Sequence, residues 1–486
     1  MCGGRSVMAL QSGRHNTDPA ADRGQRALGT VCFRMKGEVF FHDPGSRKQG
    51  GMQMRAKRYL GICMMTLWLV LCLAPVALCD VSTGDVIDQS NWQKLEGLVP
   101  DPVLNSVKKG EWTLAIDELS YDPFAYFPEF ALEARQTNVG KYGLGKDQGI
   151  VDAKTGKMPE HIIGLPFPEI DPEEPKAAVK MMHNNHYMQY LPGDLRFPFA
   201  ITWVGRGGLE REIGAVILNA AMDGWPGARD RGNSDQMEKY SVILVQSPFD
   251  VKGTAVMTWR YLDATKHDDS FGYIPAIRRV RRMSPANRSD AFVGSDFCID
   301  DANGYDGKVA DFEWKLLGQQ EAIVPFLSSE PQLIVQNEDG EWKTTRGVKE
   351  PIWGYRKDGW QGSPWAPTNL IWVKRLVYLM EVTPKDKYYN YGTHYMWIDA
   401  QTYSCNYKVI HDRSGAYWKT FVKADTNCTS EDEKMQFVSV AVQVMVEDRT
   451  DHGTVIESLT PKNIFTYYAQ IDLNDFSLSG FQSFCK

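Results

Sequence analysis

Short runs in which apolar and polar residues alternate fill the chain after Pro198. Such an alternation, broken by Gly, Asn, Asp and Ser, is the pattern of β-strands joined by turns. Because few helix-length segments separate these runs, they predict a large antiparallel sheet and disfavour a doubly wound α/β fold. The predicted strands are residues 241–246, 254–261, 271–283, 308–314, 332–336, 376–382, 395–399, 404–412, 417–423, 435–447 and 462–469.

The preceding part of the chain, residues 80–195, is richer in Pro, Gly and charged residues. Helical spacing is confined to residues 91–98 and 129–134 and to a segment that begins at Ala177. The prolines within residues 166–172 exclude a helix interior or a central strand and predict a rigid, extended connector. We therefore expect an N-terminal segment, 80–195, whose short helices pack on the sheet, and an antiparallel β domain, 196–486.

An apolar run at residues 60–73 has the flanks of a secretory signal peptide, with basic side chains before it and small residues after it. The run is shorter than the ~20 residues that a permanent membrane helix needs. We predict a signal peptide over 54–79, cleavage before Asp80 and release into the periplasm. Two alternatives stay open. One is an uncleaved anchor, and the other is a lipoprotein anchored at Cys79, for which Leu78 is bulkier than that signal favours.

Residues 1–53 precede this signal and mix Gly, Arg and Ser without any period. An exported chain rarely carries such an extension, and its composition argues against a folded unit. We interpret 1–53 as a disordered, non-native extension, with Met52 or Met54 as the true initiator.

The charge of the chain is distributed unevenly. Of 54 basic and 61 acidic side chains, 11 basic and 4 acidic ones lie in residues 1–79, so the remaining 407 residues carry 43 against 57, a net charge of −14. An acidic body of this kind excludes the basic face that a nucleic-acid-binding protein needs. We expect no nucleic-acid partner.

Four cysteines follow the predicted signal: Cys298, Cys405, Cys428 and Cys485. In an oxidising compartment they allow up to two disulfides in three pairings, and Cys405 with Cys428 is one possible pair. The spacing contains no CxxC pair, which argues against a zinc or redox site.

Searches for common chemical motifs find no phosphate-binding loop, zinc-protease motif or nucleophile elbow. His183 and His186 could share one helical turn, but no third metal ligand lies near them in the sequence. Residues 301–307 have the composition of a calcium loop, with the glycine out of place. We predict no metal, no cofactor and no catalytic residue.

The densest unusual feature is the arginine-rich run that contains Arg278, Arg279, Arg281 and Arg282. In a continuous strand, Arg278 and Arg282 would lie on one face and the other two arginines on the opposite face. Arginines on both faces need acidic partners or an anionic ligand. One interpretation is a set of structural ion pairs; the other places some of these arginines at the rim of a cavity, where they meet a lipid headgroup or a carboxylate.

Aromatic residues are frequent on the predicted strands, with Trp259 and Trp314 among them. Filling of the core accounts for any one of them. Together they also suit an apolar ligand cavity held by a curved sheet.

Several sequence blocks, in one order, are similar to an exported bacterial family, domain-of-unknown-function family 1329 (DUF1329). They are GLPFPEIDP at residues 164–172, FDVKGT at 249–254, YIPAIRRVRRM at 273–283, GSDF at 294–297, DFEW at 311–314 and RLVYLME at 375–381. The resemblance covers roughly residues 150–423. It implies an α+β, mostly β fold like that of the periplasmic lipoprotein carriers LolA and LolB, in which helices cover the concave face of a curved antiparallel half-barrel.

The resemblance further implies a periplasmic, non-enzymatic carrier or accessory protein for a lipid, acyl chain or sterol-like molecule. Members are associated with RND-type exporters, so an inner-membrane exporter and an outer-membrane acceptor are the expected partners. Two alternatives are kept: a structural, exporter-docking envelope protein without a ligand, and a periplasmic hydrolase. The candidate ligand-binding residues are Tyr273, Arg278, Arg279, Arg281, Arg282, Asp296, Phe297, Trp259 and Trp314.

Overall fold

A computed structural model describes residues 80–123 and 127–486, all of which belong to one compact unit, residues 77–486. The predicted extension 1–53 and signal peptide 54–79 lie outside the described residues. Within the described ranges, no helix has the length and apolar character that crossing a membrane would require.

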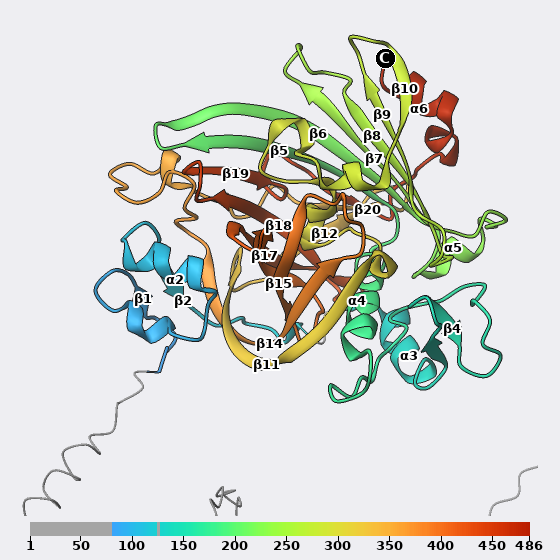
Figure 1. Cartoon of the computed structure of the whole chain (residues 1–486), viewed down its shortest axis with the longest axis horizontal. Coiled ribbons are helices and arrows are strands. Elements are labelled where there is room, and N and C mark those ends of the chain that lie inside the picture. Colours follow the sequence, from blue (N-terminus) through green and yellow to red (C-terminus); the bar gives the residue numbers. More distant parts are fainter. Residues whose placement is uncertain (1–79, 124–126) are drawn as a thin grey trace, which may run out of the picture. The chain divides into compact units, whose positions relative to one another are not determined.

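One large sheet dominates the unit (Figure 1). Its antiparallel pairs follow one another in the order β10–β9–β8–β7–β6–β5–β19–β18–β17–β16–β15–β14–β11. The strands are β1 (Val86–Ile87), β2 (Leu114–Ile116), β5 (Leu195–Gly205), β6 (Gly208–Ala221), β7 (Met237–Ser247), β8 (Ala255–Tyr261), β9 (Asp269–Ile274), β10 (Arg279–Met283), β11 (Phe312–Phe326), β12 (Gln332–Gln336), β13 (Trp342–Thr344), β14 (Ile371–Pro384), β15 (Tyr391–Asp399), β16 (Cys405–Asp412), β17 (Tyr417–Thr429), β18 (Gln436–Glu447), β19 (His452–Glu457) and β20 (Thr466–Tyr467).

The predicted mostly β fold on one large, curved sheet is confirmed. The sheet is mixed, however, because β17 also pairs in parallel with β11 and β12, and β2 pairs in parallel with β14. A separate hairpin, β3 (Tyr142–Leu144) with β4 (Ile150–Asp152), lies outside this sheet.

The helices are short. They are α2 (Asp101–Lys108), α3 (Glu129–Thr137), α4 (Ala177–Met188), α5 (Pro226–Arg229) and α6 (Leu478–Phe484). The predictions at residue 129 and at Ala177 agree with the starts of α3 and α4. The predicted helix at 91–98 is only the 3₁₀ turn η1 (Trp92–Leu95), and α2, which begins after Pro100, was not predicted.

The predicted strand 271–283 is wrong as one element. Pro275 cannot donate to a strand ladder, and Arg278 has a φ of 49°, so the chain turns back between β9 and β10. Arg278 therefore lies in a turn. Two further predicted strands have other bounds. Residues 309–311 form a 3₁₀ turn, so the strand predicted at 308–314 begins at Phe312 and runs on to Phe326 as β11, and only Thr466–Tyr467 of 462–469 pairs.

Strands β5 and β6 form a long hairpin that was not predicted. Pro198 interrupts the pattern of β5, and β6 opens with exposed charged residues, so neither shows the simple alternation of a half-buried strand at its ends. The register of the hairpin places Phe197 opposite Ile217.

Strands β6 to β9 have two differently covered faces. One face carries Val216, Leu218, Val242, Met257 and Phe271, which form a cluster with Phe476 and Phe481 of the C-terminal segment. Figure 1 shows α6 lying beside β8–β10. Because neighbouring positions of a strand point to opposite faces, the intervening residues of β6–β8 point away from α6, toward the interior.

The possible disulfide between Cys405 and Cys428 is not formed; both residues are buried free thiols. The register of β16 with β17 pairs Tyr407 with Val422, which places Cys405 opposite Ala424. Cys428 lies four residues further along β17, about 13 Å at ~3.3 Å per residue. This distance exceeds the Cα separation of ~7 Å that a disulfide can bridge.

Candidate ligand-binding site

An interior cavity of about 140 Å³ lies against the inward face of β5–β8. The other walls come from strands β17–β19, from Tyr467 of β20, from residues 188–193 at the end of α4 and after it, and from residues 285–311, which we call the cover segment. The residues of the sheet that line the cavity are Leu195, Phe197, Phe199, Ile201, Ile217, Asn219, Ala221, Lys239, Ser241, Ile243, Val256, Thr258, Lys423, Asp425, Val438, Ser439, Val440, Gln443, Ile456, Ser458 and Tyr467.

The register orders the inward side chains of β5–β8 into rows of changing polarity. The first row is apolar and consists of Phe197, Ile217, Ile243 and Val256. Two residues further along, about 7 Å, the second row begins with Leu195 on β5 and continues with the neutral polar residues Asn219, Ser241 and Thr258 on β6–β8. In the third row, Ala221 on β6 is followed by the charged residues Lys239 and Arg260 on β7 and β8, and of these two Lys239 lines the cavity. The cavity wall therefore grades from apolar to charged along the strands.

Two polar oxygens on this wall have no hydrogen-bond partner among the described residues. They are Oδ1 of Asn219 and Oε1 of Gln443, and both are buried. A buried polar group without a partner costs about 1–3 kcal/mol. A hydrogen-bond donor that reached either oxygen would therefore gain free energy.

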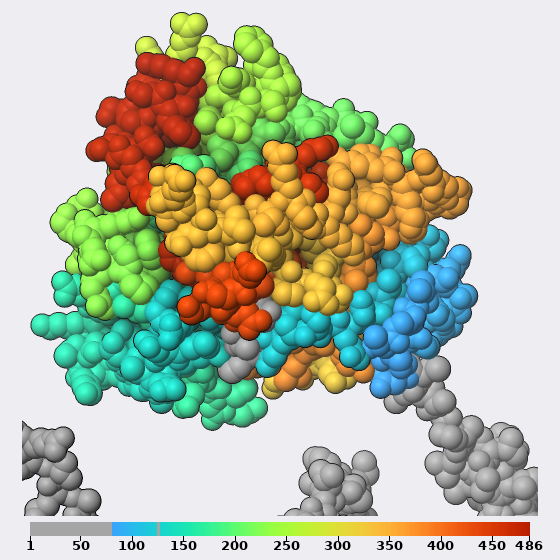
Figure 2. Space-filling model, turned by 180° about the vertical axis from the view of Figure 1, so that it is seen from behind, coloured from blue at the N-terminus to red at the C-terminus, as the bar shows by residue number. Residues whose placement is uncertain are grey.

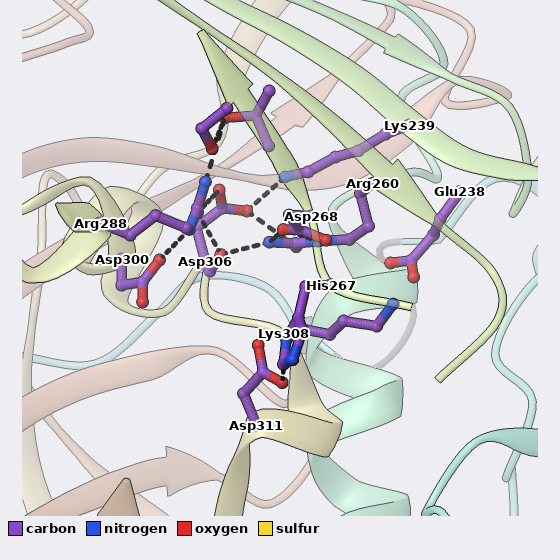
Figure 3. Close-up of polar contacts among 12 residues, drawn as sticks. Glu238, Lys239, Arg260, His267, Asp268, Arg288, Asp300, Asp306, Lys308 and Asp311 are labelled. Carbon is purple, nitrogen blue, oxygen red and sulfur yellow. Dashed lines mark hydrogen bonds and ion pairs between the residues drawn. The ribbon is translucent and has the colours of Figure 1, made fainter. Parts of the chain in front are cut away.

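The charged row is part of a buried ionic network (Figure 3). The Arg260 guanidinium donates to Asp268 Oδ2 over 2.8 Å and to the Asp306 carbonyl over 2.6 Å. Arg288 donates to Asp300 Oδ1 over 2.6 Å and to Asp306 Oδ2 over 3.1 Å, and Lys239 donates to Asp306. The side chains of Arg260 and Asp268 are no more than 3% exposed.

The pKa values reflect this mutual compensation. Burial opposes ionisation of Asp306, but Lys239, Arg260 and Arg288 outweigh it and hold the Asp306 pKa below its ordinary value. Burial raises the pKa of Asp300 and lowers that of Lys239. Asp306 is thus the charge that the cations converge on.

The cover segment contains the 3₁₀ turns η3 (Pro285–Ser289), η4 (Phe292–Gly294), η5 (Ile299–Gly304) and η6 (Val309–Asp311). Ion pairs and hydrogen bonds of its side chains bind it to the sheet. Asp301 pairs with Lys408 of β16 and accepts from Tyr391 Oη over 2.6 Å. Burial would raise the Asp301 pKa, but Lys408 and Lys419 lower it to about 2.

A second cavity, of about 530 Å³, lies on the other side of the network. Arg288 and Asp300 line it together with Lys308, Asp311 and His267. The ammonium of Lys308 is already satisfied by the carbonyls of Tyr261 and Asp263. This cavity is polar, in contrast to the apolar end of the first.

Of the predicted ligand-binding residues, only Phe297 lines the apolar cavity. Asp296 instead fastens the cover segment: its Oδ2 accepts from Thr454 over 2.6 Å and from His452 Nδ1 over 2.7 Å. Trp314 donates to the Val309 carbonyl.

Tyr273 and Trp259 belong to the opposite face of the sheet. Tyr273 is buried in the cluster under α6, and Trp259 donates to the Phe476 carbonyl. The arginines of the YIPAIRRVRRM block are exposed, on β10 and the turn before it. Arg282 forms an ion pair with Asp269.

Sequence reasoning missed the residues of the ionic network at the polar end of the cavity. Lys239, Arg260, Arg288 and Asp306 come from four separate elements, and no spacing links them. A usable signal was Arg260, a charged residue at a buried position of an otherwise apolar–aromatic strand.

The fold and this cavity define a mostly β protein whose sheet and cover segment enclose a ligand-sized interior space. The chain belongs to the family described as "Protein of unknown function (DUF1329)", which it matches over residues 86–477. The resemblance read from the sequence blocks is thereby confirmed.

Three solved structures are similar to this chain. A domain assigned to outer membrane lipoprotein sorting, from Vibrio parahaemolyticus, is 16% identical, with 62% of this chain and 97% of that one covered and a TM-score of 0.42. A DUF1329 family protein from Desulfovibrio piger is 18% identical, with coverages of 63% and 97% and a TM-score of 0.42. A LolA superfamily protein from Nitrosomonas europaea is 11% identical, with coverages of 62% and 97% and a TM-score of 0.37. No curated protein matches the chain.

Replacing Arg260 by Met should destabilise the protein by about 3–5 kcal/mol, because Asp268 and Asp306 would lose a buried partner. The free energy of unfolding in urea measures this. Arg282→Met is the matched control: Arg282 also pairs with an aspartate from a strand, but its side chain is 70% exposed, so we expect a loss below about 1 kcal/mol. Equal losses for the two variants would contradict a tightly coupled network.

Stability should fall as the pH drops from 7.5 to 5.5, in part through His394. This side chain is 2% exposed, and burial together with Lys408 lowers its pKa to about 4. The unfolded chain takes up the proton near pH 6.5 and the folded one does not, so stability is full above pH 6.5 and is lost toward pH 4.

His394→Leu should remove about 1 kcal/mol of that pH-dependent loss, measured as the difference between urea unfolding free energies at pH 7.5 and 5.5. His267→Gln is the control, since the His267 side chain is 68% exposed. An unchanged pH difference in His394→Leu would show that His394 is protonated in the folded protein.

Proposed function

We propose that this protein is a periplasmic carrier that binds an amphiphilic lipid-like molecule in the cavity between the sheet and the cover segment. The observation that carries the proposal is the gradation of the cavity wall from the row of Phe197, Ile217 and Ile243, through Asn219 and Ser241, to the charged row. A hydrocarbon part suits the first row and a hydrogen-bonding part suits the second.

The driving force for binding is burial of apolar surface, about 25 cal/mol for each Å² removed from water. The orientation comes from the polar rows. Asn219 Oδ1 and Gln443 Oε1 accept hydrogen bonds from a hydroxyl or amine of the ligand, which relieves their unpaired state. Lys239, whose ammonium is bonded only to Asp306 among the described groups, has N–H donors left for a carboxylate or hydroxyl oxygen.

The cavity of about 140 Å³ holds a group of the size of a single ring or a short acyl segment. A longer ligand requires the cover segment to move outward. Residues 292–299 of the cover segment contain only short 3₁₀ turns and no strand, so such a movement breaks no strand ladder. It does break the contacts of Asp296 with His452 and Thr454 and the bonds that Trp203 and Lys419 donate to the carbonyls of Gly294 and Asp296. Release of the ligand follows the same route.

The periplasmic location rests on the predicted signal peptide, and an RND-type exporter as partner rests on the family resemblance. Binding without catalysis is favoured because the buried carboxylates Asp268, Asp300 and Asp306 are each engaged with an arginine. A general base needs a free position within hydrogen-bond reach of a substrate.

The first test is uptake of a fluorescent fatty acid, together with mass spectrometry of lipids extracted from the purified protein. Ile243→Trp places a larger side chain in the apolar row and should weaken uptake at least tenfold. Ile352→Trp, on a side chain that is 40% exposed outside the cavity, is the matched control and should bind normally. No co-purifying lipid and no uptake by the unaltered protein would reject the carrier function.

Asn219→Leu tests the polar row separately, since the two side chains are similar in size. The variant should bind a hydroxylated fatty acid about five- to tenfold more weakly, because the acceptor oxygen is lost, while its affinity for the unsubstituted fatty acid stays the same or rises. Asn105→Leu, the same substitution at an exposed position of α2, is the control for an added apolar side chain. A uniform loss for both ligands would contradict the proposed orientation.

A further inference from the structure

Two hairpin turns at one end of the sheet form a protruding surface that we call the basic tip. It consists of the β7–β8 turn, residues 248–253, and the β9–β10 turn with the edge strand, residues 274–282. The turns are adjacent: a Cβ added at Gly253 would lie 3.3 Å from Cγ of Pro275. Figure 1 shows them beside the C-terminus, and Figure 2 shows the red C-terminal segment at the same end as these green-yellow hairpins.

Apolar side chains stand exposed on the basic tip. Phe249 is 94% exposed, Ile274 51% and Ile277 42%. A fully exposed Phe at the apex of a turn has no packing role in the folded chain, and large exposed apolar groups mark interaction sites.

The arginines of the tip are exposed and largely unpaired. Among the described residues, Arg278, Arg279 and Arg281 form no ion pair, and Arg282 pairs with Asp269. The tip contains five basic residues, the four arginines and Lys252, and one acid, Asp250, which pairs with Arg211, whereas residues 80–486 as a whole carry a net charge of −14. The tip is therefore a positively charged surface on a protein whose net charge is negative.

We propose that the basic tip docks the protein on the surface of an anionic phospholipid bilayer. Unpaired arginines bind phosphate headgroups, and exposed Phe and Ile side chains enter the interfacial region between them. The acidic remainder of the protein is repelled by the same surface, which orients the molecule with the tip toward it. An acidic protein strand added to the β10 edge is the rival, but it leaves the fully exposed Phe249 unexplained.

Vesicle flotation tests the proposal, with vesicles of phosphatidylethanolamine and phosphatidylglycerol compared with phosphatidylethanolamine and phosphatidylcholine. The protein should float with the anionic vesicles only, and 0.5 M NaCl should release it. The triple variant R278S/R279S/R281S should bind about a hundredfold more weakly, at about fivefold for each charge removed. Phe249→Ser should weaken binding several-fold without changing the salt dependence.

The matched control is K154S/R229S/R346S, which removes three exposed basic residues that form no ion pair among the described residues elsewhere on the surface. Its net charge equals that of the tip variant, and the basic residues 1–79 are the same in both. If the two triple variants bind equally weakly, net charge alone explains the binding, and the proposal is overturned. A tip variant that floats normally but no longer captures an envelope protein would also overturn it, since the tip would then serve a protein partner.

Discussion

The buried ionic network between the sheet and the cover segment is the interaction on which the cavity depends. The cover segment crosses the interior without joining a strand ladder, so side chains must bind it in place. Arg288 and Asp306 come from the cover segment, and Arg260 and Lys239 come from the sheet. Burying a charge costs several kcal/mol of desolvation free energy unless an oppositely charged partner compensates for it. In this network each acid has at least one cationic partner. The network thus fixes the cover at one end of the cavity, and there it also supplies the polar wall.

Because side chains alternate along β6–β8, one face of these strands packs in a hydrophobic core and the other face lines the cavity. One face is sealed by α6 and the C-terminal Phe476 and Phe481, which gives the strands a conventional hydrophobic core. The other face does not have to be filled for the strands to be stable, so it can leave a cavity. The cavity is therefore compatible with a rigid sheet, and any opening falls to the cover segment.

The sequence allowed the family, the mostly β class and the starts of α3 and α4 to be predicted, because these depend on local patterns and contiguous blocks. The arginine-rich run was recognised as unusual, yet its geometry was wrong, since Pro275 turns the chain before the arginines. The residues of the ionic network were missed for a different reason. Arg260, Arg288 and Asp306 acquire their role only when three separate elements meet, and a lone buried arginine was the sole local sign of this. Phe297 was identified because it lies inside the family block GSDF.

The cavity wall and the basic tip are parts of one continuous face of the sheet. Val256 lines the cavity, Gly272 of β9 lies opposite Val256, and Arg281 of β10 lies opposite Gly272. Two strand spacings, about 10 Å, therefore separate the apolar row from an exposed arginine on the same face. The position between them is a glycine, over which only the flexible Met283 side chain reaches. A tip docked on a bilayer would place the lipid headgroups close to Gly272, where the cavity wall carries no side chain of its own. The shortest path for an acyl chain between membrane and cavity then runs over Gly272, past a side chain that can change rotamer, and leaves the ionic network at the far end intact.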